Sequence, residues 1–346
     1  MSGLLKQACV LLLALAAVPA FAENQISWID DNGTSITFVR VSDGAVFTQD
    51  FAGVLPSYNV PYDWDGDGFD DVLHIVSKPS SNNGFGLEIW SPMANGMTGG
   101  VLVETDDLNV NFSSAAVIYR GDLVRSTSLD DLAVVVPGGG GVWPRLCYLD
   151  GRPLDANGNV VSDATAYQGY ATGDRDGNGI DEIYYARGSG IWFREYDGTT
   201  NTGEQKFADH AGGDLGYLQL IGDVDGDGTD DVVSLNNTNN HIVYAPIDAT
   251  IPATWTDSGM IAPVYPTQGV PGCSACFAVG QLDADPQEEI VYTNDDGFLV
   301  IVDLVDQTET ELSVGPGDGS EYVGLSIGNF MPDYLVPAEL SSFAVE

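Results

Sequence analysis

The sequence predicts an all-β protein, and within that class a β-propeller, a ring of four-stranded antiparallel sheets called blades. Glycine makes up 42 of the 346 residues and aromatic residues 10%, a composition typical of short strands joined by tight turns. After residue 22 no segment shows the apolar period of a helix. An acidic nine-residue motif also recurs about every 50 residues, a length that suits four strands with their turns.

The acidic motif occurs in three nearly identical copies, at 63–71, 174–182 and 223–231, and each copy runs directly into an apolar stretch. A fourth copy at 281–289 is altered, a fifth that starts at Asp122 keeps only its ends, and a sixth trace starts near Gly328. Each copy therefore marks the same place in a repeated unit, and we expect it to join the first strand of a blade to the second.

The remaining strands follow in order within each unit. The strands expected after the first motif are 72–76, 87–90 and 101–104, and 115–119 then opens the next unit. The same order repeats after residue 182, where 191–196 is the third strand.

The two ends of the chain predict how the ring closes. Three strand-like runs without an acidic motif, 26–29, 35–41 and 45–51, precede the first unit, and the strand at 322–327 lies near the end. Pairing this last strand with the first three would complete one blade and leave no open sheet edge. We therefore expect six blades closed by pairing of the N- and C-terminal strands, with seven as the alternative if a degenerate unit is hidden.

The first 22 residues have the features of a secretory signal peptide. Lys6 precedes the apolar run 10–18, and Ala20 and Ala22 form a small-residue cleavage site. We expect residues 23–346 to form a single propeller domain in the periplasm or outside the cell. The apolar run is too short to span a bilayer, and no later stretch approaches 18 apolar residues, so we expect no transmembrane segment.

The cysteines fit an oxidising compartment. Cys273 and Cys276 are close enough in sequence for a local disulfide. The alternative, a redox-active CxxC pair, would need a thioredoxin-like setting that the sequence does not show. We expect Cys147 to be a buried thiol.

The repeated motif has the chemistry of a cation site. Oxygen-bearing side chains at positions 1, 3, 5 and 9 are hard ligands, the glycine at position 6 allows the turn that gathers them, and position 7 can add its backbone carbonyl. The ligands expected are Asp63, Asp65, Asp67, Phe69 and Asp71 in the first copy, Asp174, Asp176, Asn178, Ile180 and Glu182 in the second, and Asp223, Asp225, Asp227, Thr229 and Asp231 in the third.

All-oxygen ligation with several carboxylates favours Ca²⁺ over transition metals. The motif is not a helical EF-hand, because that loop needs a glutamate at position 12 and flanking helices. A single Asp/Gly cluster could equally be a solvated turn without a metal. The three aligned copies favour calcium sites instead. The fourth copy offers Gln281, Asp283, Asp285 and Glu289, but Pro286 replaces its glycine, so we expect three Ca²⁺ ions and leave a fourth open.

The motif D-x-D-G-D-G-x-D-D resembles the calcium loops of the FG-GAP/VCBS repeat family, the propeller type of integrin α-subunit heads. The resemblance covers the chain from residue 23, strongly in three repeats and weakly in three. It implies calcium binding and a role in adhesion, or in carbohydrate or protein binding.

We expect the partner to bind on the face opposite the calcium loops, where the turns between second and third strands lie. The candidate contacts there are Trp143, Arg187, Trp192 and His241. Aromatic residues in such places also commonly fill the space between blades, so both interpretations stay open.

The net charge and the motifs limit the classes of function that the sequence allows. Eleven Lys and Arg residues against 51 Asp and Glu give a net charge of −40, which excludes a nucleic-acid binder. We expect a monomeric, non-catalytic module for a glycan or protein. The alternative is a polysaccharide-active lyase or hydrolase, in which His210 or His241 acts with Arg187; few basic residues make an anionic polysaccharide a poor fit.

Overall fold

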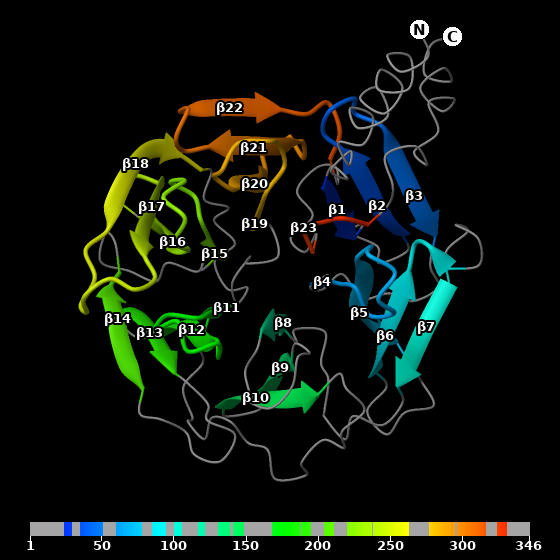
Figure 1. Cartoon of the computed structure of the whole chain (residues 1–346), viewed down its shortest axis with the longest axis horizontal. Helices are drawn as coiled ribbons and strands as arrows, with labels where there is room; N and C mark the ends of the chain where they lie inside the picture. Colours follow the sequence, from blue (N-terminus) through cyan, green and yellow to red (C-terminus); the bar gives the residue numbers. More distant parts are fainter. Residues whose placement is uncertain are drawn as a thin grey trace, which may run out of the picture.

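The structure is a computed structural model, and in it the chain forms a β-propeller (Figure 1). The residues it describes are 24–29, 35–50, 60–77, 85–94, 100–105, 117–121, 131–138, 141–148, 168–187, 189–194, 204–210, 220–236, 238–262, 277–294, 296–315 and 324–330. The predicted signal peptide and the Cys273–Cys276 pair lie outside these residues.

Within the described part of the chain, five sheets have four antiparallel strands each. The first sheet contains β23 (Ser326–Gly328), β1 (Gln25–Ile29), β2 (Ser35–Arg40) and β3 (Val46–Asp50). The second contains β4 (Val60–Tyr62), β5 (Asp71–Ser77), β6 (Phe85–Ser91) and β7 (Gly100–Thr105). The others contain β11 (Gln168–Gly173), β12 (Glu182–Arg187), β13 (Gly190–Arg194) and β14 (Gln205–Asp209); β15 (Leu220–Gly222), β16 (Asp231–Asn236), β17 (His241–Pro246) and β18 (Thr256–Ile261); and β19 (Phe277–Gly280), β20 (Glu289–Thr293), β21 (Leu299–Asp303) and β22 (Thr308–Glu311).

A further sheet has three strands: β8 (Val117–Gly121), β9 (Asp131–Gly138) and β10 (Gly141–Tyr148). The expected count of six four-stranded blades, or seven, is therefore wrong. The structure has five such blades, and the three-stranded sheet takes the remaining place in the ring. This sheet belongs to the repeat with the most degenerate motif, in which Val124 stands at position 3, and the residues after β10 lie outside the described part.

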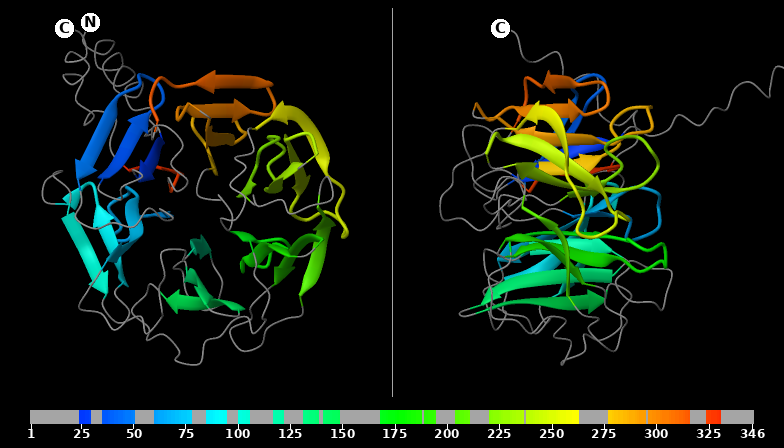
Figure 2. Two further views of the ribbon diagram at one scale, coloured as in Figure 1. Left: turned by 180° about the vertical axis from the view of Figure 1, so that it is seen from behind. Right: turned by 90° about the vertical axis from the view of Figure 1, so that its left-hand side faces the viewer.

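The ring closes as expected. β1 pairs antiparallel with β23, with Ile26 opposite Ile327 and Ser27 opposite Ser326, and the two serine Oγ atoms lie 2.7 Å apart. The innermost strands contact one another in the cyclic order β4, β8, β11, β15, β19 and β23. Figure 2 shows the same ring from behind and from the side.

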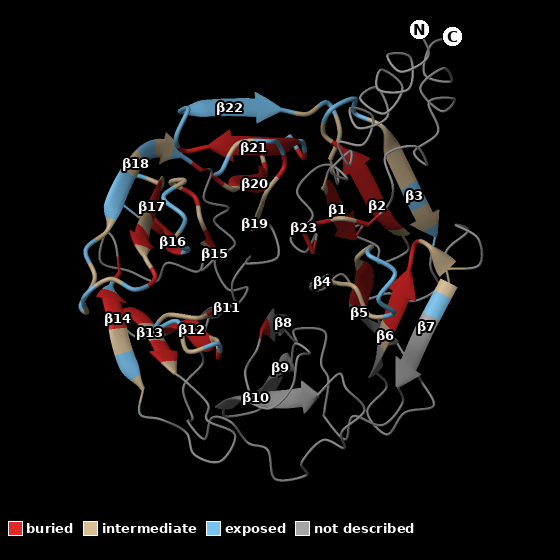
Figure 3. Cartoon of the chain, viewed as in Figure 1, coloured by how far each residue is buried: buried red, intermediate tan, exposed pale blue. Residues whose placement is uncertain are grey.

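Burial is greatest in the two middle strands of a blade, is partial in the innermost strand and is least in the outermost one, which explains the residue pattern of the strands. All five residues of β20 and of β21 are buried, whereas the outermost strand β22 is exposed throughout. Apolar residues of these strands therefore form the core between neighbouring sheets, and Figure 3 marks the buried residues in red. Within the described residues, no helix is long and apolar enough to cross a membrane.

Candidate metal centres

Four loops connect the innermost strand of a blade to its second strand, at the places where the sequence predicts the acidic motif. They lead from β4 to β5, β11 to β12, β15 to β16 and β19 to β20. In the first three loops the glycines at positions 4 and 6 have positive φ angles, from 69° to 90°, a conformation that glycine adopts without strain. The predicted role of the position 6 glycine is confirmed, and position 4 shares it.

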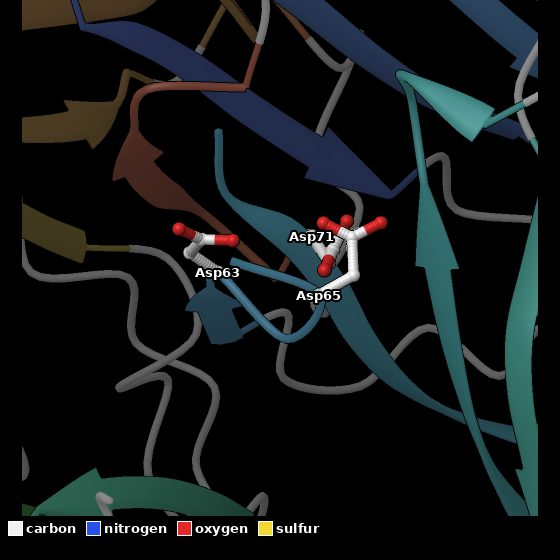
Figure 4. Close-up of side chains that lie close together, drawn as sticks. All are labelled: Asp63, Asp65 and Asp71. Carbon is white, nitrogen blue, oxygen red and sulfur yellow. The ribbon is translucent and has the colours of Figure 1, made fainter. Parts of the chain in front are cut away.

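The aspartate at position 1 organises each of these loops. In the loop at 223–231, Asp223 Oδ1 accepts hydrogen bonds from the backbone N–H groups of Gly226 and Asp227, and its Oδ2 accepts one from Gly228, at 2.9–3.1 Å. Asp63 accepts the same three bonds in the first loop. The curled backbone gathers the acidic side chains, as Figure 4 shows for Asp63, Asp65 and Asp71.

Position 9 carries a buried carboxylate that is half satisfied by protein. In the first loop, Asp71 Oδ2 accepts a hydrogen bond from the Trp64 N–H at 2.8 Å, and in the fourth, Glu289 Oε2 accepts one from the Leu282 N–H at 2.7 Å. The other oxygen is buried without a hydrogen-bond partner in Asp71, Asp231 and Glu289, whose side chains are 1–3% exposed. An unpaired buried carboxylate oxygen is costly, and a cation would satisfy it.

Burial and crowding raise the pKa of these carboxyl groups. Loss of water raises the pKa of Asp71 to about 6 and those of Asp231 and Glu289 to about 7. Repulsion from the other carboxylates in each loop adds to the effect, for example from Asp225 and Asp227 on Asp231. A bound cation would oppose both influences and lower these pKa values, because its positive charge favours the ionised carboxylates.

The carboxylates of three loops converge. Ligand atoms lie within 4.8 Å of one another in the sets Asp63, Asp65 and Asp71; Asp223, Asp225 and Asp231; and Asp283, Asp285 and Glu289. In the loop at 174–182, Asp174 accepts two of these three backbone bonds, from the N–H groups of Asn178 and Gly179, but the loop is not among the convergent sets in the described residues. The carbonyls of Phe69, Ile180 and Thr229 stay predicted ligands. The side chains at position 5 instead accept the N–H of position 7, as Asp67, Asn178 and Asp227 do at 2.8–2.9 Å.

The fourth loop is closed differently. Gln281, at position 1, donates its amide N–H groups to the carbonyls of Asp285 and Gln287 at 2.5 and 3.0 Å. Gln287 is position 7. The carbonyl that is the predicted ligand in the other loops therefore accepts a hydrogen bond from Gln281 here. A further convergent set lies beside this loop, in which Asp303 and Asp306 from the turn between β21 and β22 approach Asp285. This set could not be predicted from the sequence, because Asp303 and Asp306 lie outside the motif.

Position 8 holds a second acid in every loop, and sequence reasoning assigned it no role. The carboxylate of Asp70 accepts a hydrogen bond from the Asn329 N–H of the neighbouring blade at 2.8 Å. Burial raises the pKa of its counterpart Glu288, and the N–H of Asp223, again in a neighbouring blade, opposes that rise by hydrogen bonding. The only sign of this contact in the sequence is that positions 8 and 9 of each motif are both acidic.

The predicted partner-binding residues lie on neighbouring sheets. Arg187 and His241 stand at the hairpins between second and third strands, opposite Gly190 and Asn236 respectively. Trp143 lies on β10 near the equivalent hairpin, and its side chain and that of Arg187 fall outside the described part. Trp192 is half-buried, with Lys206 Nζ 5.9 Å from its ring.

The two histidines of the enzyme alternative differ in access. His241 Nδ1 lies 2.8 Å from Asp257 Oδ1 at the protein surface. His210 is 8% exposed, so its ring is poorly placed for a polymeric substrate.

Acidification should stabilise the cation-free protein. The three position 9 carboxyls have folded-state pKa values of about 6–7, above about 4 in an unfolded chain. The folded state therefore binds more protons between about pH 4 and 7, and the free energy of unfolding falls as pH rises through that window. We expect a higher melting temperature at about pH 5 than at about pH 8 in metal-free buffer. A higher value at pH 8 would contradict the assignment of these raised pKa values.

No family model matches the chain, and no curated protein matches it. Solved structures do resemble it. One, described as showing specific recognition of non-reducing terminal N-acetylglucosamine by an Agrocybe aegerita lectin, is 12% identical, has a TM-score of 0.48 and matches over 88% of this chain and 95% of that one. Apo AztD from Citrobacter koseri is 10% identical, with a TM-score of 0.39 over 88% and 98%. A putative 6-phosphogluconolactonase from Bacteroides fragilis is 12% identical, with a TM-score of 0.37 over 86% and 83%. Likeness at this level of identity concerns the fold alone.

Proposed function

We propose that the chain is a secreted β-propeller of the FG-GAP/VCBS type, stabilised by calcium, that binds a glycan or a protein without chemical turnover. The main support for a bound cation is a buried carboxylate oxygen without a hydrogen-bond partner. It recurs at position 9 of the loops, as Asp71 Oδ1, Asp231 Oδ2 and Glu289 Oε1. Its repetition at equivalent places favours a shared ligand over a local packing fault.

The donor set fits calcium. Each convergent set consists of carboxylates only, and such hard oxygen ligands favour Ca²⁺ or Mg²⁺ over transition metals. Ca²⁺ accepts six to eight ligands in irregular geometry, whereas Mg²⁺ requires a near-ideal octahedron and retains several waters. Loops that offer up to four side chains and a backbone carbonyl therefore suit Ca²⁺ better. We propose ions in the loops at 63–71 and 223–231, where the carboxylates converge, and a third ion in the loop at 174–182, on the likeness of its motif and of its hydrogen bonds to Asp174.

The fourth loop supports weaker binding. Its Glu289 keeps the unpartnered oxygen, but the Gln281 amide engages the position 7 carbonyl. A cation there would have to displace this bond.

The cations serve the fold, and the opposite face is left for the partner. Loops between first and second strands and hairpins between second and third strands lie at opposite ends of an antiparallel blade. The hairpins at 187–190 and 236–241 belong to neighbouring sheets, since β11 contacts β15. Trp192 and His241 thus come from adjoining blades. An aromatic ring with polar neighbours is a surface on which sugars stack and hydrogen-bond, and a net charge of −40 favours a neutral glycan over an anionic one.

Glycan and protein arrays, read with and without excess EDTA, test the binding role. We expect Trp192→Ala to weaken binding about tenfold, since a stacked aromatic contributes about 1–1.5 kcal/mol. Trp64→Ala should leave binding unchanged, because that half-buried tryptophan lies in the loop at 63–71, at the end of a blade opposite these hairpins. Release of unsaturated uronate from polysaccharides would instead establish the enzyme alternative, and equal binding by both variants would remove this face from the proposal.

A further inference from the structure

We propose that cation binding in the loop at 63–71 is coupled to closure of the propeller ring, and that Asn329 is the positioning residue that couples them. The inference rests on the proposed cation binding and extends it. It concerns the boundary between the first cation loop and the residues that follow β23, two segments more than 250 residues apart in sequence.

Three hydrogen bonds join the loop to the closing strand. The Asp70 N–H donates to the Asn329 carbonyl at 2.7 Å, and the Asn329 N–H donates to Asp70 Oδ2 at 2.8 Å. The Asn329 side chain adds a bond from Nδ2 to the Gly68 carbonyl at 2.9 Å. Asp70 and Asn329 thus each both donate and accept a hydrogen bond, so the contact fixes the distance and the orientation of the two segments.

The loop side of this contact consists of the cation site itself. Asp70 precedes the buried ligand Asp71, and the Gly68 N–H donates to Asp63 Oδ2 at 3.0 Å. Without a cation, the carboxylates of the loop repel one another, and a loop that spreads moves both the Gly68 carbonyl and the Asp70 carboxylate. A bound cation would therefore hold in place the groups that Asn329 contacts.

On the other side of the contact, the ring is closed by hydrogen bonds alone, without a covalent link. β23 pairs with β1 over only three residues, Gly328, Ile327 and Ser326, and no peptide bond links the two strands within the blade. Elsewhere the strands of a blade follow one another along the chain. The bonds from Asn329 consequently matter more for closure here than equivalent bonds would at another boundary.

An equivalent contact between two other blades supplies a control. The Glu288 N–H donates to the Asp223 carbonyl at 2.7 Å, and the Glu288 carboxylate accepts from the Asp223 N–H. A glycine precedes the contact at both boundaries, and a Cβ on Gly328 would lie 2.8 Å from Asp70 Oδ2 while one on Gly222 would overlap Glu288 Oε2. At the second boundary no chain end is held, so loss of the contact cannot open the ring.

Coupling of this kind is reciprocal. If the cation strengthens closure, closure strengthens cation binding by the same factor. Asn329 should therefore affect the affinity of the first loop, and a vacant first loop should loosen β23 more than any other vacant loop does.

Hydrogen exchange tests the effect of the cation on closure. Asp65→Asn and Asp225→Asn each remove the position 3 carboxylate of one loop, and both side chains face solvent enough to be replaced without repacking. In excess calcium, we expect amides of β1 and β23 to exchange about tenfold faster in Asp65→Asn than in Asp225→Asn, a value within the usual range of coupling between sites. Equal exchange in the two variants would overturn the coupling.

Terbium luminescence tests the reverse direction. Trp64 stands at position 2 of the first loop, where the other loops have Arg175, Val224 and Leu282, so Tb³⁺ luminescence sensitised by tryptophan reports on this loop. We expect Asn329→Ala to weaken Tb³⁺ binding about fivefold, the effect of one net hydrogen bond, and Glu288→Ala to leave it unchanged. Sensitised binding of equal affinity in Asn329→Ala would refute the coupling alone, whereas a wild-type protein without sensitised terbium would refute the cation site.

Discussion

Removal of calcium with EDTA is expected to lower the melting temperature by about 6 °C. Free ion at about ten times its dissociation constant stabilises a folded protein by roughly 1.4 kcal/mol per site, so three sites contribute roughly 4 kcal/mol. With an unfolding entropy of about 2.1 cal/mol/K per residue, each kcal/mol shifts the melting temperature of a chain of this length by about 1.5 °C. The effect is large because a typical domain has only about 5–15 kcal/mol of stability.

A matched variant separates site loss from other effects of the chelator. Asp65→Asn, Asp176→Asn and Asp225→Asn together remove the position 3 carboxylate from all three loops. We expect this triple variant to melt near the temperature of the chelated wild type and to be insensitive to EDTA. Calcium, added back in excess, should restore the wild type fully and the triple variant little. A wild-type melt that EDTA leaves unchanged would contradict the assignment of the ligands.

Asp231→Asn is expected to change stability in opposite directions with and without calcium. The Asp231 side chain is 1% exposed, and its pKa is raised to about 7, so at about pH 8 the cation-free fold contains a buried, ionised and partly unpaired carboxylate. Because its folded-state pKa lies above the unfolded value, ionisation opposes folding at this pH. Asparagine removes the charge. In chelator, the melting temperature should rise by a few degrees; in calcium, it should fall by about 2 °C as one site is lost.

Asp248→Asn is the control for this prediction. Asp248 is exposed, and the substitution removes the same charge from the surface of the same blade. We expect its melting temperature to stay within about 1 °C of wild type in both conditions. If Asp231→Asn lowered stability equally with and without calcium, its carboxylate would be a structural hydrogen-bond acceptor and not a cation ligand.

The sequence predicted what the repeat determines and missed what lies between repeats. The strands at 72–76 and 87–90 were placed correctly, because the acidic motif fixes where each blade begins and apolar runs mark its strands. Pairing of β1 with β23 could also be predicted, since an incomplete set of strands at each end leaves one closed solution. The blade count was wrong because a degenerate motif such as that at Asp122 does not show how many strands follow it.

Contacts between blades could not be predicted from one repeat alone. The bonds of Asp70 with Asn329 and of Glu288 with Asp223 join residues of different repeats, and the motif shows only that an acid stands at position 8. Similarly, the sequence predicts Gln281 at position 1 only as a weaker ligand. In the structure, its amide donates hydrogen bonds to the carbonyls of Asp285 and Gln287 and so closes the loop. The register of one blade against the next decides such contacts, and it depends on the packing of the whole ring.

The number of calcium ions that the protein binds is the most direct test of the cation assignment. Calorimetric titration of metal-free protein with calcium is expected to give about three sites per chain with dissociation constants of about 10⁻⁴–10⁻³ M or tighter, as in extracellular calcium modules. Asp225→Asn should remove one of them. Titration without binding heat, together with no bound calcium in elemental analysis of the purified protein, would contradict the account.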